Sequence, residues 1–327
     1  DEDPLDLTRL ICTVSLEHNC YVETPLTGET DFTEPLKITV IDVQGNRHNN
    51  TIKILPTPPK TKFTKVWDKN AVELNINDRN LSGLAMNDKY LAVQLYDGNI
   101  YRYDKKSGSA IDVVSSARSF MMKADVDDAG HLITARENIY GAGFMVYYYS
   151  EEDNEHHLLL DYTNDDGCPE DLGYEISVIG DVTNGKSFIY GMAPGTMTVY
   201  YWELMDGELV TPAAVPNTLR YGPAGGNSDR AQIQRASLDA NSDHYISYYI
   251  PSTDDADDEY RKEKKGSRFN IFSPYMEINE LNPQNHSYKI LDFKVFTVND
   301  DVFLATIEQN YTAWSNAKVQ VFEITNR

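Results

Sequence analysis

A strand–turn–strand unit that recurs five times after residue 60 constrains this fold more than any other feature of the sequence. In each unit a short polar turn is followed directly by an apolar strand. The turns are residues 87–89, 127–130, 183–186, 241–243 and 299–301. Because the units recur about every 40 to 60 residues, the pattern predicts a repeat architecture.

A third strand, aromatic or β-branched, follows each pair of strands. Three or four antiparallel strands at this spacing are typical of a β-propeller, in which each sheet is a blade beside a central channel. We predict an all-β fold with five blades, and six remain an alternative because a divergent blade could lie between residues 205 and 235. The last repeat shows three strands only, and a strand from 63–77, either 66–67 or 71–74, would complete it and close the ring.

The sequence pattern predicts that residues 1–59 form a separate unit. Short runs at 10–16, 36–43 and 51–55 alternate in the manner of strands, with turn residues between them. Residues 56–59, with the sequence Pro-Thr-Pro-Pro, form a stiff spacer that ends this region. The sequence therefore predicts a small immunoglobulin-like β-sandwich at 1–59 and a propeller at 60–327.

The charge balance excludes whole classes of partner. The chain carries 29 Lys and Arg against 51 Asp and Glu, a net charge of −22. Nucleic-acid phosphates would repel such a chain, so no nucleic-acid partner is expected, and anionic membrane surfaces are disfavoured for the same reason. No apolar run approaches the ~20 residues that a membrane-spanning helix needs, so no transmembrane segment is expected.

Three cysteines leave the redox state open. Cys12 and Cys20 either flank a hairpin and form a disulfide or remain free thiols, and Cys168 stands alone in a polar stretch. No spacing typical of a metal site or a cofactor-binding motif is present, so neither a metal nor a cofactor is predicted.

The loops between second and third strands carry the best candidates for ligand binding. They gather aromatic residues among Asn, Asp and Gln, and the connections between blades add Tyr174 and Tyr221 on the same face. The predicted ligand-binding residues are Tyr96, Tyr140, Tyr311 and Trp314. Aromatic rings that stack against sugar C–H groups, together with amides and carboxylates that hydrogen-bond to sugar hydroxyls, would recognise a glycan. The alternative is that these rings pack the loops onto the sheet ends.

Carboxylates suggest two further kinds of site. Residues 125–130 space their acidic groups as a calcium loop does but lack the distal glutamate. Asp181, Asp239 and Asp292 lie on or near first strands, which line the channel, and a propeller-type glycoside hydrolase would need a pair of facing carboxylates. No recognisable catalytic motif is present and no catalytic residue is predicted, so a binding protein is favoured over an enzyme.

Residues 31–40, Gly45 and the Thr-Ile-Lys-Ile run at 51–54 resemble the end of an immunoglobulin-like domain of Bacteroides-type exported surface lipoproteins. In that family such domains often precede uncharacterised β-propellers. The resemblance implies export to the cell envelope or outer-membrane surface, with a lipid anchor upstream of Asp1. It also implies a glycan or a cell-surface protein as the partner, and it supplies no catalytic residues.

Overall fold

The computed structural model describes residues 7–12, 14, 16, 19–24, 26, 28–54, 64–76, 81–115, 117–118, 121–153, 155–221, 230–250, 266–272, 278–280, 288–310 and 318–324. The chain divides into two compact units, Asp1–Thr64 and Lys65–Arg327. Apart from the short 3-10 turns η1 (Leu7–Arg9) and η3 (Asn164–Asp166), the regular structure of the described part is β-strand. Among these residues no helix has the length and apolar character that crossing a membrane requires.

The first unit contains two small antiparallel sheets. One pairs β1 (Leu10–Ile11) with β3 (Glu29–Thr30), and the other has the order β2 (Tyr21–Val22), β4 (Leu36–Ile41) and β5 (Arg47–Ile52). Phe32 and Ile41 are its buried hydrophobic residues in the described part. Cys12 and Cys20 are free thiols, because each follows or precedes a strand of a different sheet.

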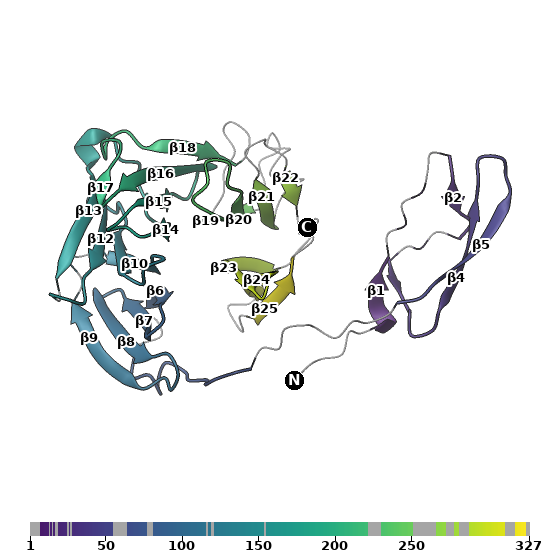
Figure 1. The fold of residues 1–327 in the computed structure, drawn as a ribbon, viewed down its shortest axis with the longest axis horizontal. Coiled ribbons are helices and arrows are strands. Elements are labelled where there is room, and N and C mark those ends of the chain that lie inside the picture. Colours follow the sequence, from purple (N-terminus) through teal and green to yellow (C-terminus); the bar gives the residue numbers. More distant parts are fainter. Residues whose placement is uncertain are drawn as a thin grey trace. The chain divides into compact units, whose positions relative to one another are not determined.

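The second unit consists of five antiparallel sheets, each built from strands consecutive in the chain (Figure 1). The first two are β6 (Leu81–Met86), β7 (Tyr90–Leu95), β8 (Asn99–Asp104), β9 (Ala110–Ser115) and β10 (Met121–Val126), β11 (Leu132–Arg136), β12 (Phe144–Tyr149), β13 (His156–Tyr162). The third is β14 (Glu175–Gly180), β15 (Lys186–Met192), β16 (Thr198–Met205) and β17 (Glu208–Leu209), with β18 (Asn217–Arg220) also paired to β16. The last two are β19 (Arg230–Arg235), β20 (His244–Ile250), β21 (Gly266–Phe272), β22 (Ile278–Glu280) and β23 (Tyr288–Val298), β24 (Asp301–Asn310), β25 (Lys318–Glu323).

The fifth sheet keeps three described strands, and the predicted strand from 63–77 does not complete it. Residues 64–76 form no strand and pack on the first sheet instead. The indole Nε1 of Trp67 donates to the carbonyl of Lys105 at 2.8 Å, and the Tyr103 hydroxyl donates to the carbonyl of Leu74 at 2.7 Å. The prediction of ring closure by this segment is therefore wrong, because the aromatic anchors of the first sheet bind it.

Position within a sheet decides how apolar a strand is. The second strands β7, β11 and β15 are buried along nearly their whole length. Neighbouring sheets cover both faces of β11 and β15, whereas one face of β7 is covered by residues 64–76. The outer strand β9 is exposed at almost every residue. This gradient explains why the continuous apolar runs of the sequence directly follow the polar turns.

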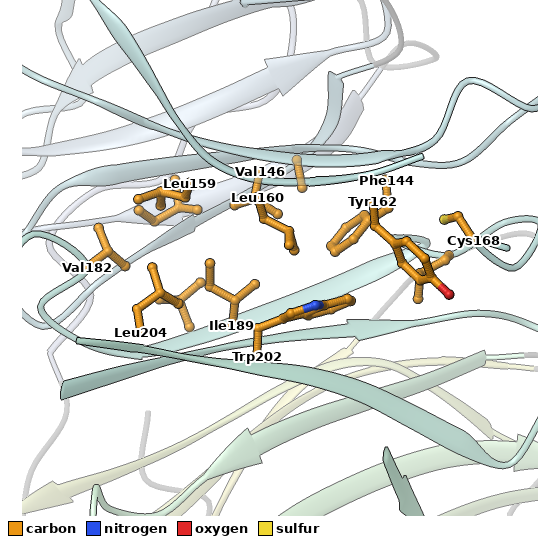
Figure 2. Close-up of a cluster of buried hydrophobic side chains, with 14 of the residues drawn as sticks. Phe144, Val146, Leu159, Leu160, Tyr162, Cys168, Val182, Ile189, Trp202 and Leu204 are labelled. Carbon is orange, nitrogen blue, oxygen red and sulfur yellow. The ribbon is translucent and has the colours of Figure 1, made fainter. Parts of the chain in front are cut away.

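The largest core lies between the second and third sheets. Phe144 and Leu160 from the second sheet meet Ile189, Trp202 and Leu204 from the third, all of them fully or almost fully buried (Figure 2). The rings of Phe144 and Trp202 pack in a tilted arrangement at a centroid distance of 5.5 Å. Burial of such side chains contributes roughly 1.5–3 kcal/mol each, so this interface is the chief source of stability in the second unit.

Two glycines permit the close approach of neighbouring sheets. A Cβ on Gly83 of β6 would lie 2.8 Å from the backbone nitrogen of Ala124 on β10. A Cβ on Gly173, whose φ is +94°, would lie 2.6 Å from the ring of Phe144. Neither position accepts a larger residue without displacing backbone or core, so these glycines fix the sheet spacing.

Candidate functional site

A cavity of about 720 Å³ lies where the first strands of the five sheets converge. Residues of β6, β10, β14, β19 and β23 line it, together with part of β24 and Val319 of β25. The volume falls within the ~300–1,000 Å³ typical of small-molecule sites. Five repeats that are far apart in the sequence thus contribute to one site.

Alternate residues of each first strand face this cavity, because successive side chains of a strand point to opposite sides. On β10, Ala124 and Val126 pack in the core beside the first sheet, which leaves Lys123 and Asp125 on the opposite side. The corresponding pairs on β14, β19 and β23 are Glu175 and Ser177, Gln232 and Gln234, and Asp292 and Lys294. These charged and amide side chains share the lining with apolar ones, among them the exposed Leu84 and Met86 on β6.

Asp125 joins the second sheet to the third. Its Oδ1 accepts a hydrogen bond from the backbone N–H of Val126 at 2.8 Å, and its Oδ2 accepts one from Val178 of β14 at 2.8 Å. Burial raises the pKa of Asp125, while the charge of Lys294 and the two amide donors oppose that rise. Because both oxygens are held by backbone, the side chain has little freedom to reorient.

Two glutamines join the fourth sheet to the fifth in a similar way. The Gln234 side chain accepts from the N–H of Val295 at 2.8 Å and donates to its carbonyl at 2.7 Å. Gln232 Oε1 accepts from the N–H of Phe293 at 3.1 Å. These amides thus substitute for the ladder bonds that β19 and β23 do not form directly.

A third group of charges lies at the β10–β14 end of the cavity. Lys123 Nζ is 3.2 Å from Glu175 Oε1 and 5.1 Å from the ring centroid of Tyr174. Glu137 is buried nearby, and burial raises its pKa to about 7. The charge of Lys123 opposes this rise, and the charges of Asp171 and Glu175 add to it. Glu137 therefore exchanges its proton near neutral pH.

Among the charged residues that line the cavity, Asp292 and Lys294 are exposed, whereas Lys123, Asp125 and Glu175 are partly buried. Asp292 accepts from the N–H of Phe293 at 2.7 Å and is hydrogen-bonded by the side chain of Gln232. The surrounding protein raises the pKa of Asp292, the Phe293 amide opposes the rise and the charge of Asp125 adds to it. Within the described residues, the Lys294 ammonium forms no hydrogen bond or ion pair.

The predicted loop aromatics divide into exposed and packed residues. Tyr96 is 58% exposed and Tyr140 is 90% exposed, with Tyr140 at a φ of +56°, a conformation uncommon for a bulky residue. Tyr221 is buried and its hydroxyl donates to the carbonyl of Thr196 at 2.9 Å, so the prediction that it joins the exposed face is wrong. Tyr311 and Trp314 lie outside the described residues.

Of the three carboxylates predicted to line the channel, Asp292 lines the cavity and two do not. Asp181 accepts from the N–H and hydroxyl of Thr183 within its own turn, at 2.8 and 2.7 Å. Asp239 accepts from the hydroxyl of Ser237 at 3.3 Å, and its carbonyl accepts from Arg235 at 2.6 Å. The placement of Asp181 and Asp239 in the channel is wrong, because both follow the end of their strand.

The acidic loop at 125–130 is bound to protein donors. Asp127 Oδ1 accepts from the N–H groups of Ala129 and His131 at 3.1 and 2.8 Å. Its Oδ2 accepts from the N–H of Val182 at 2.9 Å and from His131 Nδ1 at 2.8 Å. Asp128 adds a bond to the third sheet, accepting from the N–H of Gly180 at 2.8 Å.

Asp127, His131 and Asp181 are the described residues whose ligand atoms lie close enough together to hold a metal ion. Asp127 is buried and its two oxygens already accept four hydrogen bonds. An ion there would have to replace those bonds, so the geometry fits a structural junction better than a metal centre.

Sequence reasoning missed most of the cavity residues. Lys123, Gln232 and Gln234 stand at alternate positions of predicted first strands, between apolar residues. That period-2 polar pattern was the available signal, because a polar residue alternating with core residues on an inner strand must face the channel. No comparable signal marks Glu137, whose burial depends on a loop of another repeat.

Comparisons with known proteins follow the division of the chain. The family described as "Domain of unknown function (DUF8500)" matches residues 65–327. No curated protein matches the sequence. Among solved structures, the hydrazine synthase of Kuenenia stuttgartiensis is similar with a TM-score of 0.45 and 7% identity, covering 84% of this chain and 70% of that chain. A likeness of that size carries no argument about function.

Proposed function

We propose, from the premise that this chain belongs to the DUF8500 family, that its second unit is a five-bladed β-propeller that binds a ligand without transforming it. The ligand is a glycan or another cell-surface partner. The observation that carries this proposal is the convergence of five first strands on one cavity of small-molecule size, which is lined by both polar and apolar groups.

Closure of the propeller is part of the proposal. Leu84 and Met86 of the first sheet line the same cavity as Ala305 and Val319 of the fifth. That residues of the first and the fifth sheet line one cavity supports a closed ring, because it brings the two ends of the sheet series to the same place. Six blades remain the alternative architecture.

The ends of the blades extend the proposed binding surface. Tyr96 and Tyr140 each follow a second strand, β7 or β11, and so lie on loops at the same end of their sheets. Their exposed rings suit stacking against sugar C–H faces, and Tyr311 and Trp314 remain predicted partners in this role.

The cellular location of the protein is also part of the proposal. The resemblance of residues 31–54 to surface lipoproteins supports an immunoglobulin-like unit at 1–59 and export to the cell envelope, with a lipid anchor upstream of Asp1. A glycan or a cell-surface protein is the partner that such a location would offer.

One observation favours a second function, glycoside hydrolysis. Asp125 and Asp292 both line the cavity, and each has a raised pKa, as an acid in a hydrolase requires. Against this, both oxygens of Asp125 are held by backbone amides of two sheets, which fixes the side chain and opposes its protonation in the role of an acid.

A glycan array with the full chain, followed by product analysis of each hit, tests both functions. Binding with intact glycans is the expected result. Release of shortened glycans that is lost in Asp292→Asn would replace the binding function with hydrolysis. An array without any hit would remove the glycan proposal and leave a protein partner.

A further inference from the structure

The polar groups of the cavity differ in whether they are already used by the fold. Asp125 binds two backbone amides, Gln234 binds both backbone groups of Val295, and Lys123 is paired with Glu175. These side chains join one sheet to the next. They are poorly placed to exchange their partners for a ligand, because each would leave an unsatisfied group behind.

Asp292 and Lys294 are used less fully by the fold: Asp292 is hydrogen-bonded by the Phe293 amide and the Gln232 side chain, and Lys294 forms no hydrogen bond or ion pair among the described residues. They stand two residues apart on β23, so both side chains lie on the same side of the strand, while Phe293 and Val295 between and after them are buried. Asp292 keeps acceptor capacity beyond its bonds with Phe293 and Gln232, since a carboxylate can accept about four hydrogen bonds. Lys294 offers three donors.

The signs of these charges restrict what can bind. Asp292 and Lys294 lie side by side, and Lys294 also interacts electrostatically with Asp125. The carboxylates therefore repel an anion, and the ammonium repels a second cation. A hydroxyl group suits both, because it donates to the carboxylate and accepts from the ammonium.

Apolar side chains also line this cavity. Leu84 and Met86 of β6 and Val319 of β25 are exposed to it, Val319 by 72%. A ligand that fills the cavity must therefore present both hydroxyl groups and C–H groups to its walls. Pyranose rings combine a polar edge with an apolar face.

We propose that the cavity binds a neutral sugar unit of one or two rings, with Asp292 and Lys294 holding its hydroxyl groups. This inference rests on the proposed glycan-binding function and names the ligand class and the specificity-determining residues of that site. Lys294 disfavours positively charged sugars, and Asp292 disfavours negatively charged ones.

Isothermal titration calorimetry of the full chain with maltose, cellobiose and lactose, and with glucosamine and glucuronate, tests the inference. At least one neutral disaccharide should bind at concentrations up to about 10 mM. Asp292→Asn and Lys294→Met should each weaken it about tenfold, with the melting temperature retained. Lys106→Met, in the exposed turn before β9, is the matched control and should bind as the original chain does.

Several results would overturn the inference. These are the absence of binding by all three neutral disaccharides, tighter binding of either charged sugar, or unchanged affinity in both cavity variants. Glycan binding on the array that survives Asp292→Asn and Lys294→Met but is lost in Tyr140→Ala would place the ligand on the loop face. That outcome refutes the cavity inference alone, whereas an array without hits refutes the proposed function.

Discussion

Asp125 and Asp292 stand on the first strands of the second and fifth sheets, and each accepts a hydrogen bond from the N–H of the next residue. Their remaining oxygens differ. The Asp125 Oδ2 is bound to Val178 of the following sheet, whereas Asp292 faces the cavity beside Lys294. The third sheet contacts β10 through β14. No strand of the first sheet contacts β23 to a comparable extent among the described residues.

The comparison shows that a carboxylate on an inner strand has two uses. Where the next sheet brings an amide within reach, the carboxylate becomes a structural connector. Where the adjacent sheet offers only a side-chain amide, as Gln232 does to Asp292, the carboxylate keeps acceptor sites for a ligand. The type of residue does not distinguish the two cases, and only the neighbouring sheet does.

The strongest test of the connector role is Asp127→Ala. The substitution leaves the N–H groups of Ala129, His131 and Val182 without their acceptor in a buried position. We expect a loss of about 3–5 kcal/mol in the free energy of unfolding, measured by urea denaturation. Asp128→Ala, which removes one bond at an exposed residue, is the control and should cost about 1 kcal/mol. Equal losses in the two variants would show that burial does not matter here.

Glu137→Gln tests the buried acid near the cavity. Because the pKa of Glu137 is raised from 4.5 to about 7 in the folded state, ionising this group costs stability as the pH rises through that window. The variant should therefore be more stable than the original chain by about 1–3 kcal/mol at pH 8 and show no gain below pH 4.5. Glu152→Gln, in an exposed turn, should show no such pH dependence. A destabilised variant at pH 8 would mean that the carboxylate has a partner it needs.

Asp125→Asn and Asp292→Asn compare the two carboxylates directly. An amide at position 125 would place an NH₂ group against a backbone N–H, so we expect a loss of about 1–2 kcal/mol by thermal or urea unfolding. At position 292 the cavity accommodates either end of the amide, and the expected change is below about 0.5 kcal/mol. The reverse order would contradict the division between connector and ligand residue.

Metal addition should have the smallest effect. The oxygens of Asp127 already accept hydrogen bonds, so millimolar Ca²⁺ or Zn²⁺ should leave the melting temperature of the full chain unchanged. A rise that disappears in His131→Ala would show that the Asp127, His131 and Asp181 cluster binds the ion after all.

Local patterns predicted more of the fold than of the site. The polar turns and the apolar strands after them lie where the sequence places them, because a turn and a buried strand depend on neighbouring residues. The ring-closing strand was wrong because Trp67 finds its acceptor on Lys105, which no local pattern reveals. Tyr140 and Tyr221 look alike in sequence, but the Tyr221 ring packs against Tyr248 in a core and its hydroxyl donates to Thr196, contacts that no local pattern reveals.

The bonds from Asp125, Asp127 and Asp128 to the third sheet have a consequence for motion. Neither sheet can separate from the other without breaking three hydrogen bonds between carboxylates and backbone amides at once. The pair should consequently open as one cooperative unit, so that the amide hydrogens of Val178, Gly180 and Val182 exchange with solvent at a common, slow rate. Small movements elsewhere in the second unit would then take place around this rigid pair.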